Sequence, residues 1–169
     1  MRAVAEEMLP LIQEEGFWTR KAYSLKNRQF DKESDGYDCA AMSLGHGVDL
    51  LQESYSEKGL LSESYIVEVL AGELLMQGYD AYNRYIAEHT DRHVARYHFP
   101  GSEDSFSLEM LPELLKELTQ EITCNAAFCM QPKKSVVFVS ELTQDEKIHC
   151  QGICAACSNL SCPNRQGEN

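Results

Sequence analysis

The sequence predicts an α+β fold, because two long amphipathic stretches are accompanied by short β-branched runs that do not alternate regularly with them. The longer helix is expected over residues 62–89, and a second one runs from Leu111 towards Ile122. Residues 135–140 read Ser-Val-Val-Phe-Val-Ser, which is the composition of a strand. This mixed order of elements disfavours a doubly wound parallel sheet.

The N-terminal third predicts weaker elements. Apolar residues at Val4, Met8 and Leu11 have nearly helical spacing, and Pro10 should make that helix short or kinked. Residues 17–30 mix aromatic and basic side chains and are compatible with a strand. The polar residues 31–38 indicate a turn.

Residues 39–47 form a short apolar run that ends in Gly45-His46-Gly47, typical of a buried strand that leads into a helix near Val48. The third glycine of a dinucleotide-binding loop is missing, so that function is not indicated. For the helix over residues 62–89, Ser62 is the expected N-cap.

Residues 97–107 are rich in proline, glycine, serine and acidic side chains, and predict a loop. The helix after it should carry one apolar face, with Pro112 in its first turn, where the missing N–H does little harm. The expected members of that face are Leu111, Leu114, Leu115, Leu118 and Ile122.

Length and charge exclude several classes of function. The 169 residues suffice for one core-forming domain. A formal net charge of −12 repels phosphate backbones, so nucleic acid is not an expected partner. No apolar run is long enough to span a bilayer, and carboxylates interrupt the N-terminus before a signal-peptide core could form. We therefore expect a cytoplasmic protein with reduced thiols and no membrane partner.

The strongest chemical signal is a group of cysteines near the C-terminus: Cys150, Cys154, Cys157 and Cys162, followed by Pro163. Four closely spaced thiolates are the ligands of iron–sulfur clusters, and zinc accepts the same set. The compact spacing favours a cluster; zinc and a metal-free thiol tail remain alternatives. We accordingly expect an α+β domain over residues 1–147 and a metal-binding tail over residues 148–169.

The other cysteines and histidines predict structural roles. Cys39, Cys124 and Cys129 lie in apolar segments and are expected to be buried as small hydrophobic side chains. His89 and His93 are four residues apart, the spacing of a two-histidine metal site, but no glutamate follows His89 as in metalloproteases. Exposed histidines near a helix end are the preferred interpretation.

Four segments, in order and spacing, resemble the activation domain of vitamin B12-dependent methionine synthase, in its short stand-alone form. Residues 43–45 (Ser-Leu-Gly) resemble a turn of that family, and residues 65–77 resemble the helix after it. Residues 96–101 (Arg-Tyr-His-Phe-Pro-Gly) stand in the position of its Arg-x-x-x-Gly-Tyr loop. Residues 130–136 (Met-Gln-Pro-Lys-Lys-Ser-Val) match the segment that leads into a strand. Stand-alone relatives often end in a cysteine motif such as Cys154-x2-Cys157-x4-Cys162, with an arginine nearby.

The resemblance implies a twisted antiparallel sheet flanked by helices. It also implies an accessory role in returning oxidised cobalamin to its methylated state, with S-adenosylmethionine as methyl donor. The domain would do little bond chemistry itself and would present the donor to a corrinoid held by a partner, so no residue is assigned as catalytic.

The residues implied for the donor are Arg96, which would pair with its carboxylate, and Pro100, Gly101 and Ser102. Ser102 replaces the family's tyrosine, and the glycine lies one residue further from Arg96. The expected partners are a corrinoid protein or corrinoid-dependent methyltransferase and an electron-donor protein, which the acidic surface would help to recruit. The alternative is a non-catalytic binding module with the same fold and a zinc-stapled tail.

Overall fold

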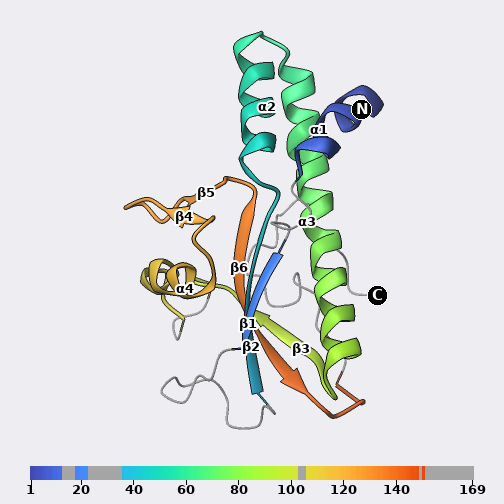
Figure 1. Cartoon of the computed structure of the whole chain (residues 1–169), viewed down its shortest axis with the longest axis vertical. Coiled ribbons are helices and arrows are strands. Elements are labelled where there is room, and N and C mark those ends of the chain that lie inside the picture. Colours follow the sequence, from blue (N-terminus) through green and yellow to red (C-terminus); the bar gives the residue numbers. More distant parts are fainter. Residues whose placement is uncertain (13–17, 23–35, 103–105, 149, 151–169) are drawn as a thin grey trace.

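The computed structural model describes residues 1–12, 18–22, 36–102, 106–148 and 150. Its helices are α1 (Arg2–Met8), η1 (Leu9–Leu11), α2 (His46–Glu57), α3 (Leu61–His89), η3 (Leu108–Met110) and α4 (Leu111–Leu118), where η marks a 3-10 turn. The strands are β1 (Trp18–Ala22), β2 (Gly36–Ser43), β3 (His93–His98), β4 (Thr123–Cys124), β5 (Met130–Gln131) and β6 (Ser135–Thr143). Helices with antiparallel sheets confirm the α+β class (Figure 1).

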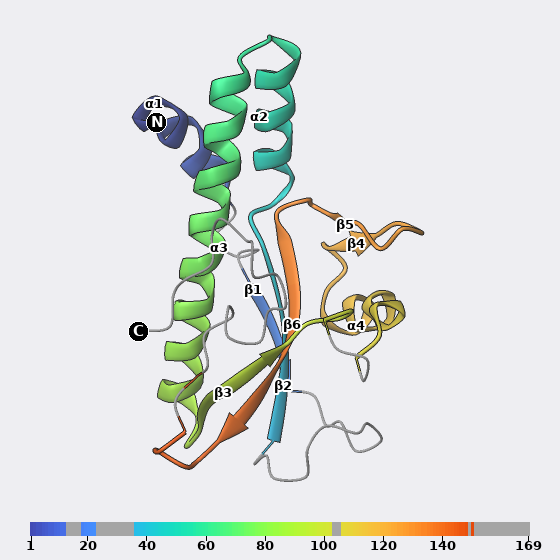
Figure 2. The ribbon, with the colours of Figure 1, turned by 180° about the vertical axis from the view of Figure 1, so that it is seen from behind.

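The main sheet has four antiparallel strands in the order β1-β2-β6-β3. Its central pair, β2 and β6, is in register from Gly36 opposite Leu142 to Ser43 opposite Ser135. The short strands β4 and β5 form a separate hairpin. Figures 1 and 2 show α3 along one side of the main sheet and α4 on the other side.

The face of the sheet covered by α3 has an aromatic core, formed by Tyr79, Tyr82, Tyr97 and Phe138. The ring centroids of Tyr82 and Phe138 are 5.0 Å apart and those of Tyr79 and Tyr97 are 5.2 Å apart, both pairs edge to face. Edge-to-face contact places the positive ring edge on the negative ring face, which adds to the stabilisation that burial provides.

A buried polar group interrupts this aromatic core. The Tyr82 hydroxyl donates a hydrogen bond of 2.7 Å to Asp38 Oδ2 and lies 2.5 Å from Ser140 Oγ. All three residues are almost fully buried. Burial, reinforced by the Asp38 carboxylate, raises the pKa of Tyr82, so the phenol stays protonated and available as a donor.

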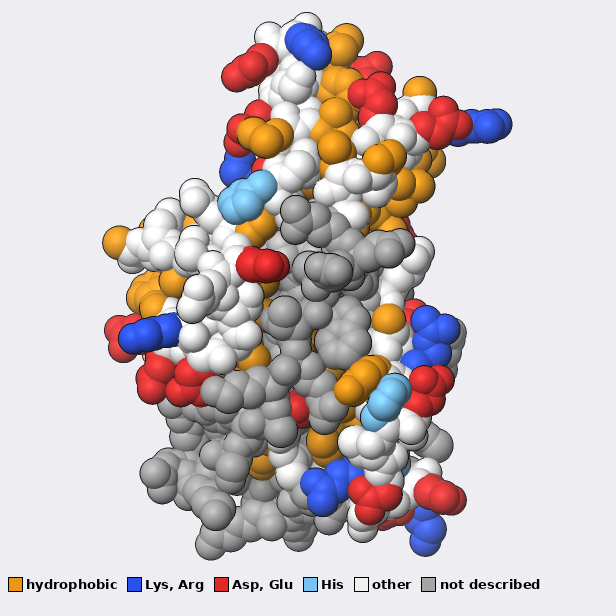
Figure 3. Space-filling model, viewed as in Figure 1, with side chains coloured by type: hydrophobic (Ala, Val, Ile, Leu, Met, Phe, Trp, Pro, Cys, Tyr) orange, Lys and Arg blue, Asp and Glu red, His pale blue; other side chains and the backbone are white. Residues whose placement is uncertain are grey.

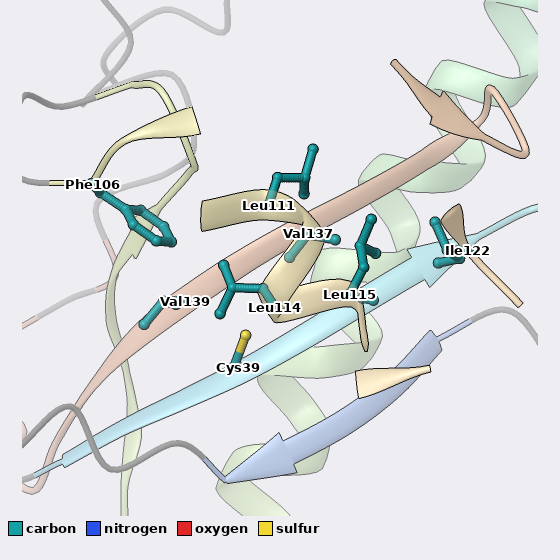
Figure 4. Close-up of a cluster of buried hydrophobic side chains, with 9 residues drawn as sticks. Cys39, Phe106, Leu111, Leu114, Leu115, Ile122, Val137 and Val139 are labelled. Atoms are coloured by element: carbon teal, nitrogen blue, oxygen red, sulfur yellow. The ribbon is translucent and has the colours of Figure 1, made fainter. Parts of the chain in front are cut away.

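The face covered by α4 has an aliphatic core instead. Leu111, Leu114 and Leu115 of α4 pack onto Val137 and Val139 of β6 (Figure 4). Cys39 and Ala41 of β2, Phe106 and Ile122 complete this cluster. Pro112 lies in the first turn of α4, as predicted. Ile122 is buried as expected, but it lies beyond the helix, which ends at Leu118.

A third cluster lies where α2 and α3 extend together past the end of the sheet (Figure 2). Val4 and Met8 of α1 pack there against Leu44, Val48 and Val67. Helix α1 is short and passes at Leu9 into the 3-10 turn that contains Pro10, in agreement with the sequence. Among the described residues, no helix is long and apolar enough to cross a membrane.

Strand β3 was not predicted: its first four residues had been assigned no element, and its last two, Tyr97 and His98, fall in the loop expected over residues 97–107. A register shift between Val94 and Arg96 places an extra residue, Ala95, in the strand. Val94 and Tyr97 consequently both pack in the core under α3 although they are three residues apart. The bulge removes the period of two by which an amphipathic strand is recognised.

Two element ends also differ from the prediction. Strand β2 begins at Gly36, inside the expected turn, because Asp38 is buried against Tyr82 and Ser140 rather than exposed. Helix α3 begins at Leu61, so Ser62 is not its N-cap. The chain enters α3 directly from the turn after α2, where the Leu60 amide donates to the Tyr55 carbonyl at 2.9 Å.

Candidate functional site

Arg96, the expected ligand of the donor carboxylate, is a half-buried residue of β3 rather than of a loop. It lies opposite Glu141 of the neighbouring strand β6. Because successive strand residues point to opposite faces, Arg96 and Glu141 belong to the face that α4 covers, whereas Tyr97 points towards α3. A cationic and an anionic side chain therefore share one part of this face.

His98 belongs to the same polar group. Its side chain is buried, with Nε2 at 3.5 Å from Glu141 Oε2, and its ring centroid lies 6.5 Å from that of Tyr37. Glu141 itself is partly exposed, at 23% of its side-chain surface. The group of Tyr37, Arg96, His98 and Glu141 thus combines buried polar atoms with a carboxylate that solvent reaches. We call this set the β3–β6 polar group.

The other expected donor-binding residues follow the end of β3. Gly101 has φ +82°, a conformation that glycine adopts readily, and its amide donates to the Phe106 carbonyl at 2.7 Å. Ser102 Oγ donates to the Phe99 carbonyl at 2.7 Å and closes the turn around the half-buried Pro100. The structure therefore places these residues in one tight turn, whereas Arg96 lies on the strand before it.

Two of the segments on which the family resemblance depends meet at one end of the central strands. The Leu44 amide donates to the Lys134 carbonyl at 3.0 Å, and Ser135 Oγ donates to Ser43 Oγ at 2.9 Å. Ser135 Oγ also lies 2.7 Å from the Pro132 carbonyl. Residues 43–45 and 130–136, about 90 positions apart in the chain, form one hydrogen-bonded junction.

Charged contacts fasten this junction to the helices. Asp49 of α2 accepts a hydrogen bond of 2.7 Å from the Lys133 amide, and the Lys133 ammonium lies 2.7 Å from Glu53 Oε1. The Lys134 ammonium pairs with Glu68 of α3. Hydrogen bonding to Lys134 lowers the pKa of the Glu68 carboxyl.

The C-terminal segment is held against the α3 side of the sheet up to its first cysteine. His93 Nε2 lies 2.6 Å from the Ile148 carbonyl. Cys150 is half-buried and packs at the edge of the aromatic core that contains Tyr97 and Phe138. Burial raises the pKa of the Cys150 thiol.

The predicted metal centre is not tested by these contacts. Cys154, Cys157 and Cys162 lie outside the described residues, as does most of the predicted tail over residues 148–169. Within the described part of the chain, no group of three or more His, Cys, Asp or Glu side chains is placed to hold a metal ion. The four-cysteine ligand set and the boundary after residue 147 stay predictions.

The remaining three cysteines had been expected to be buried, and this is correct for one of them. Cys39 is fully buried under α4, but Cys124 is half-buried and Cys129 is exposed. Both belong to the hairpin of β4 and β5, which stands beside the domain instead of inside its core (Figure 1). His89 is the last residue of α3, and its ring stacks on that of Tyr85 with the ring centroids 4.1 Å apart. His93 lies on β3, so the two histidines do not share a helix face.

Sequence reasoning missed His98 and Glu141 as neighbours of Arg96. Glu141 lies two residues after Val139 in β6, and this spacing of two is the signal that would have placed it on the α4 face with Val137 and Val139. His98 had no such signal, because the bulge in β3 hides which of its residues point to which face.

A different surface is apolar. Leu50, Leu60, Leu61 and Tyr65 are exposed large hydrophobic residues on α2, α3 and the turn between them, with Leu61 69% and Tyr65 68% exposed. Figure 3 shows hydrophobic side chains at the surface of this projecting end of the molecule, interspersed with acidic ones. We call these four residues the hairpin-end apolar surface.

Comparisons with known proteins assign no family to the chain. No family model matches the sequence, and no curated protein matches it significantly.

Proposed function

We propose that the chain is an accessory protein for reductive activation of a cobalamin-dependent methyltransferase such as methionine synthase. In such an activation one electron reduces cob(II)alamin to cob(I)alamin. The methyl group of S-adenosylmethionine then passes to the cobalt, and S-adenosylhomocysteine is left. The chain would hold the methyl donor, while a partner protein holds the corrinoid. This proposal rests on the family resemblance of four sequence segments and on the chemistry of the β3–β6 polar group.

The observation that carries the proposal is the position of Arg96 opposite Glu141 on one sheet face. S-adenosylmethionine has a carboxylate, an ammonium group and a positively charged sulfonium. A guanidinium pairs with a carboxylate through two parallel hydrogen bonds, and a carboxylate attracts the two cationic groups. The polar group therefore has one side chain of each charge that this ligand requires, beside the buried imidazole of His98.

A second observation supports the same assignment. The segments over residues 43–45 and 130–136, which are two of the four that carry the family resemblance, form one junction between β2 and β6. Their contact supports the resemblance as a whole.

The direct test is isothermal titration of the full chain with S-adenosylmethionine. We expect binding in the wild type, and a loss of roughly 10-fold or more in affinity for Arg96→Ala, since a charge-assisted hydrogen bond is worth about 1.5–3 kcal/mol. Arg84→Ala is the matched control, because Arg84 is an exposed arginine of α3. No binding at millimolar donor, or equal affinity of the Arg96→Ala and Arg84→Ala proteins, would contradict the proposed site.

The role of Glu141 is tested by comparing two ligands. S-adenosylhomocysteine lacks the sulfonium charge, so Glu141 should favour S-adenosylmethionine over it. In Glu141→Gln this preference should shrink several-fold, because the attraction between carboxylate and sulfonium is removed while the side-chain shape is kept. An unchanged ratio of the two affinities would show that Glu141 does not face the sulfonium.

The metal-centre part of the proposal is tested by anaerobic purification, followed by iron, sulfide and zinc analysis and an absorption spectrum. A broad absorption band with matching iron and sulfide would support a cluster that delivers or senses electrons. Stoichiometric zinc without colour would instead make the tail a structural staple.

A second candidate function is a binding module that keeps the fold without using the methyl donor. The hairpin-end apolar surface favours it, because several large apolar side chains are exposed at one end of the molecule, and exposed apolar surface is typical of interaction sites. Titration separates the two functions: the binding module predicts no heat with S-adenosylmethionine, and its partner binding should be lost in Tyr65→Lys but kept in Arg96→Ala.

A further inference from the structure

The outer side of α3 carries a row of exposed positions without charged side chains. Leu61, Tyr65 and Val69 are spaced four residues apart, and Gly72 follows three residues later, which places all four on one face of the helix. The three side chains are 69%, 68% and 39% exposed, and Gly72 is exposed as well. We call these four residues the outer α3 face.

The opposite face of the same helix already provides the packing that holds α3 in place. Val67 and Ala71 are fully buried there, in the third cluster with Met8 of α1 and Val48 of α2. The core of the chain therefore does not require the outer α3 face. Large apolar side chains that are exposed in a row at helical spacing are typical of a surface that binds another helix.

Gly72 is the least expected member of this face. Glycine in a helix interior is less stable than alanine. A methyl group added at Gly72 would meet no other atom within 4 Å, so no described residue packs into the space that the missing side chain leaves. Next to Val69 and Tyr65, this space allows the side chains of a second helix to come close to the backbone of α3.

The charges around the face indicate the chemistry of that second helix. Residues 1–12 and 46–76 contain eight acidic residues but only two basic ones. The two lysines that precede β6 are already paired with carboxylates of α2 and α3. Glu73, one turn after Val69, has no ion pair among the described residues. Such an acidic border attracts a basic partner and repels a second copy of this chain, whose net charge is −12.

We propose that the outer α3 face binds an amphipathic helix of a partner protein. The apolar side of that helix packs on Leu61, Tyr65 and Val69, and its basic side chains meet the acidic border. Helix α3 lies along one side of the main sheet, whereas the β3–β6 polar group belongs to the side that α4 covers (Figures 1 and 2). Binding at this face depends on neither the methyl donor nor the metal centre.

The test titrates the full chain into a fluorescently labelled peptide of about five helical turns, made of leucine and lysine at amphipathic spacing, and follows the anisotropy. The wild type should bind this peptide but not the matched peptide of leucine and glutamate. Tyr65→Ala should weaken binding roughly 10-fold, because tyrosine is enriched among the residues that dominate interface affinity. Leu50→Ala is the control and should bind like the wild type, because Leu50 is 64% exposed on α2, outside the row. Neither substitution changes the charge.

Two further comparisons test the space at Gly72 and the acidic border. Gly72→Ala should melt roughly 2–4 °C higher, because alanine favours the helix, and yet bind the peptide several-fold more weakly, because the methyl group fills the space. Glu73→Gln should bind several-fold more weakly and with a smaller dependence on salt. Glu88→Gln, at an exposed carboxylate near the other end of α3, should bind like the wild type.

Absence of binding to the leucine–lysine peptide, or an equal loss in Tyr65→Ala and Leu50→Ala, overturns the docking face. Unchanged binding in Gly72→Ala overturns the close approach at this glycine, and equal affinities of Glu73→Gln and Glu88→Gln overturn the basic character of the partner. Phosphatidylcholine vesicles that bind the wild type but not Tyr65→Ala would assign the face to a membrane surface and overturn the helix partner.

The same Tyr65→Ala protein separates this face from the proposed donor site. Its affinity for S-adenosylmethionine should equal that of the wild type, because Tyr65 lies on α3 and the donor residues follow β3 on the other side of the sheet. Arg96→Ala should conversely bind the peptide like the wild type. A protein that binds the peptide but no methyl donor would overturn the proposed function alone, and the reverse result would overturn the docking face alone.

Discussion

The two faces of the sheet are stabilised by different chemistry. Under α4 the core is aliphatic, and the polar residues of that face, Arg96, buried His98 and Glu141, are not members of the aliphatic cluster. Under α3 the polar residues Asp38 and Ser140 lie inside the core and are satisfied there by Tyr82. Polar groups that are buried and paired with each other stabilise the fold. Arg96 is half-buried and Glu141 is partly exposed, and under the proposed function these two side chains meet the ligand.

This difference predicts what mutations on each face should change. A side chain in either core should affect the free energy of unfolding, because buried contacts are lost. The β3–β6 polar group should affect ligand binding more than stability.

The largest effect is expected for Leu114→Ala under α4. Leu114 is 2% exposed and contributes to the cluster on Val137 and Val139. Truncation removes buried methyl groups and leaves a cavity, which costs about 3 kcal/mol of unfolding free energy within a usual range of 2–5. Urea unfolding followed by circular dichroism measures this. Leu50→Ala, at a leucine that is 64% exposed, is the control and should change stability by less than about 0.5 kcal/mol.

That α4 would pack through one leucine-rich face could be predicted from the sequence. Leu111, Leu114 and Leu115 have the spacing of an amphipathic helix, and the structure buries all three. The same holds for α3 and for β6, where local periodicity or β-branched composition is strong. These elements follow from interactions between residues that are near each other in the chain.

Elements that depend on distant partners could not be predicted in this way. Asp38 suggests a turn by composition, yet it continues β2 because Tyr82, 44 residues away, donates to it. For the candidate site, Arg96 was found through a motif, but its neighbour Glu141 was not, because the pairing of β3 with β6 is set by a bulge that the sequence does not reveal. The metal-binding role of the cysteines after Cys150 stays a prediction from their spacing in the sequence, because these residues lie outside the described part of the chain.

A somewhat smaller effect is expected for Tyr82→Phe under α3. The substitution keeps the ring contacts with Phe138 but removes the hydroxyl that donates to the buried Asp38 carboxylate. Loss of one partner from a buried charged group costs about 2 kcal/mol. The melting temperature should fall by roughly 4–8 °C in a chain of this size. Tyr65→Phe, at a tyrosine that is 68% exposed, should melt like the wild type. Equal melting of both variants would mean that the polar group under α3 does not stabilise the fold.

The smallest effect is expected for Glu68→Gln. Glu68 lies on the solvent-exposed part of α3, so this variant tests an exposed polar contact of the helix that also forms the buried core. The Glu68 side chain is 54% exposed and pairs with Lys134, so solvent screening limits its contribution to about 0.5 kcal/mol. Hydrogen bonding to Lys134 lowers the folded-state pKa of Glu68 below that of the unfolded chain. Folding therefore favours the ionised form of Glu68, and the pair contributes to the free energy of unfolding at pH values above the unfolded-state pKa of about 4.3. This contribution is lost as the pH falls through the lowered pKa that Glu68 has in the folded protein. The difference in unfolding free energy between wild type and Glu68→Gln should therefore be visible at pH 7 and vanish near pH 3, whereas a difference that persists at pH 3 would show that packing, and not charge, is lost in the variant.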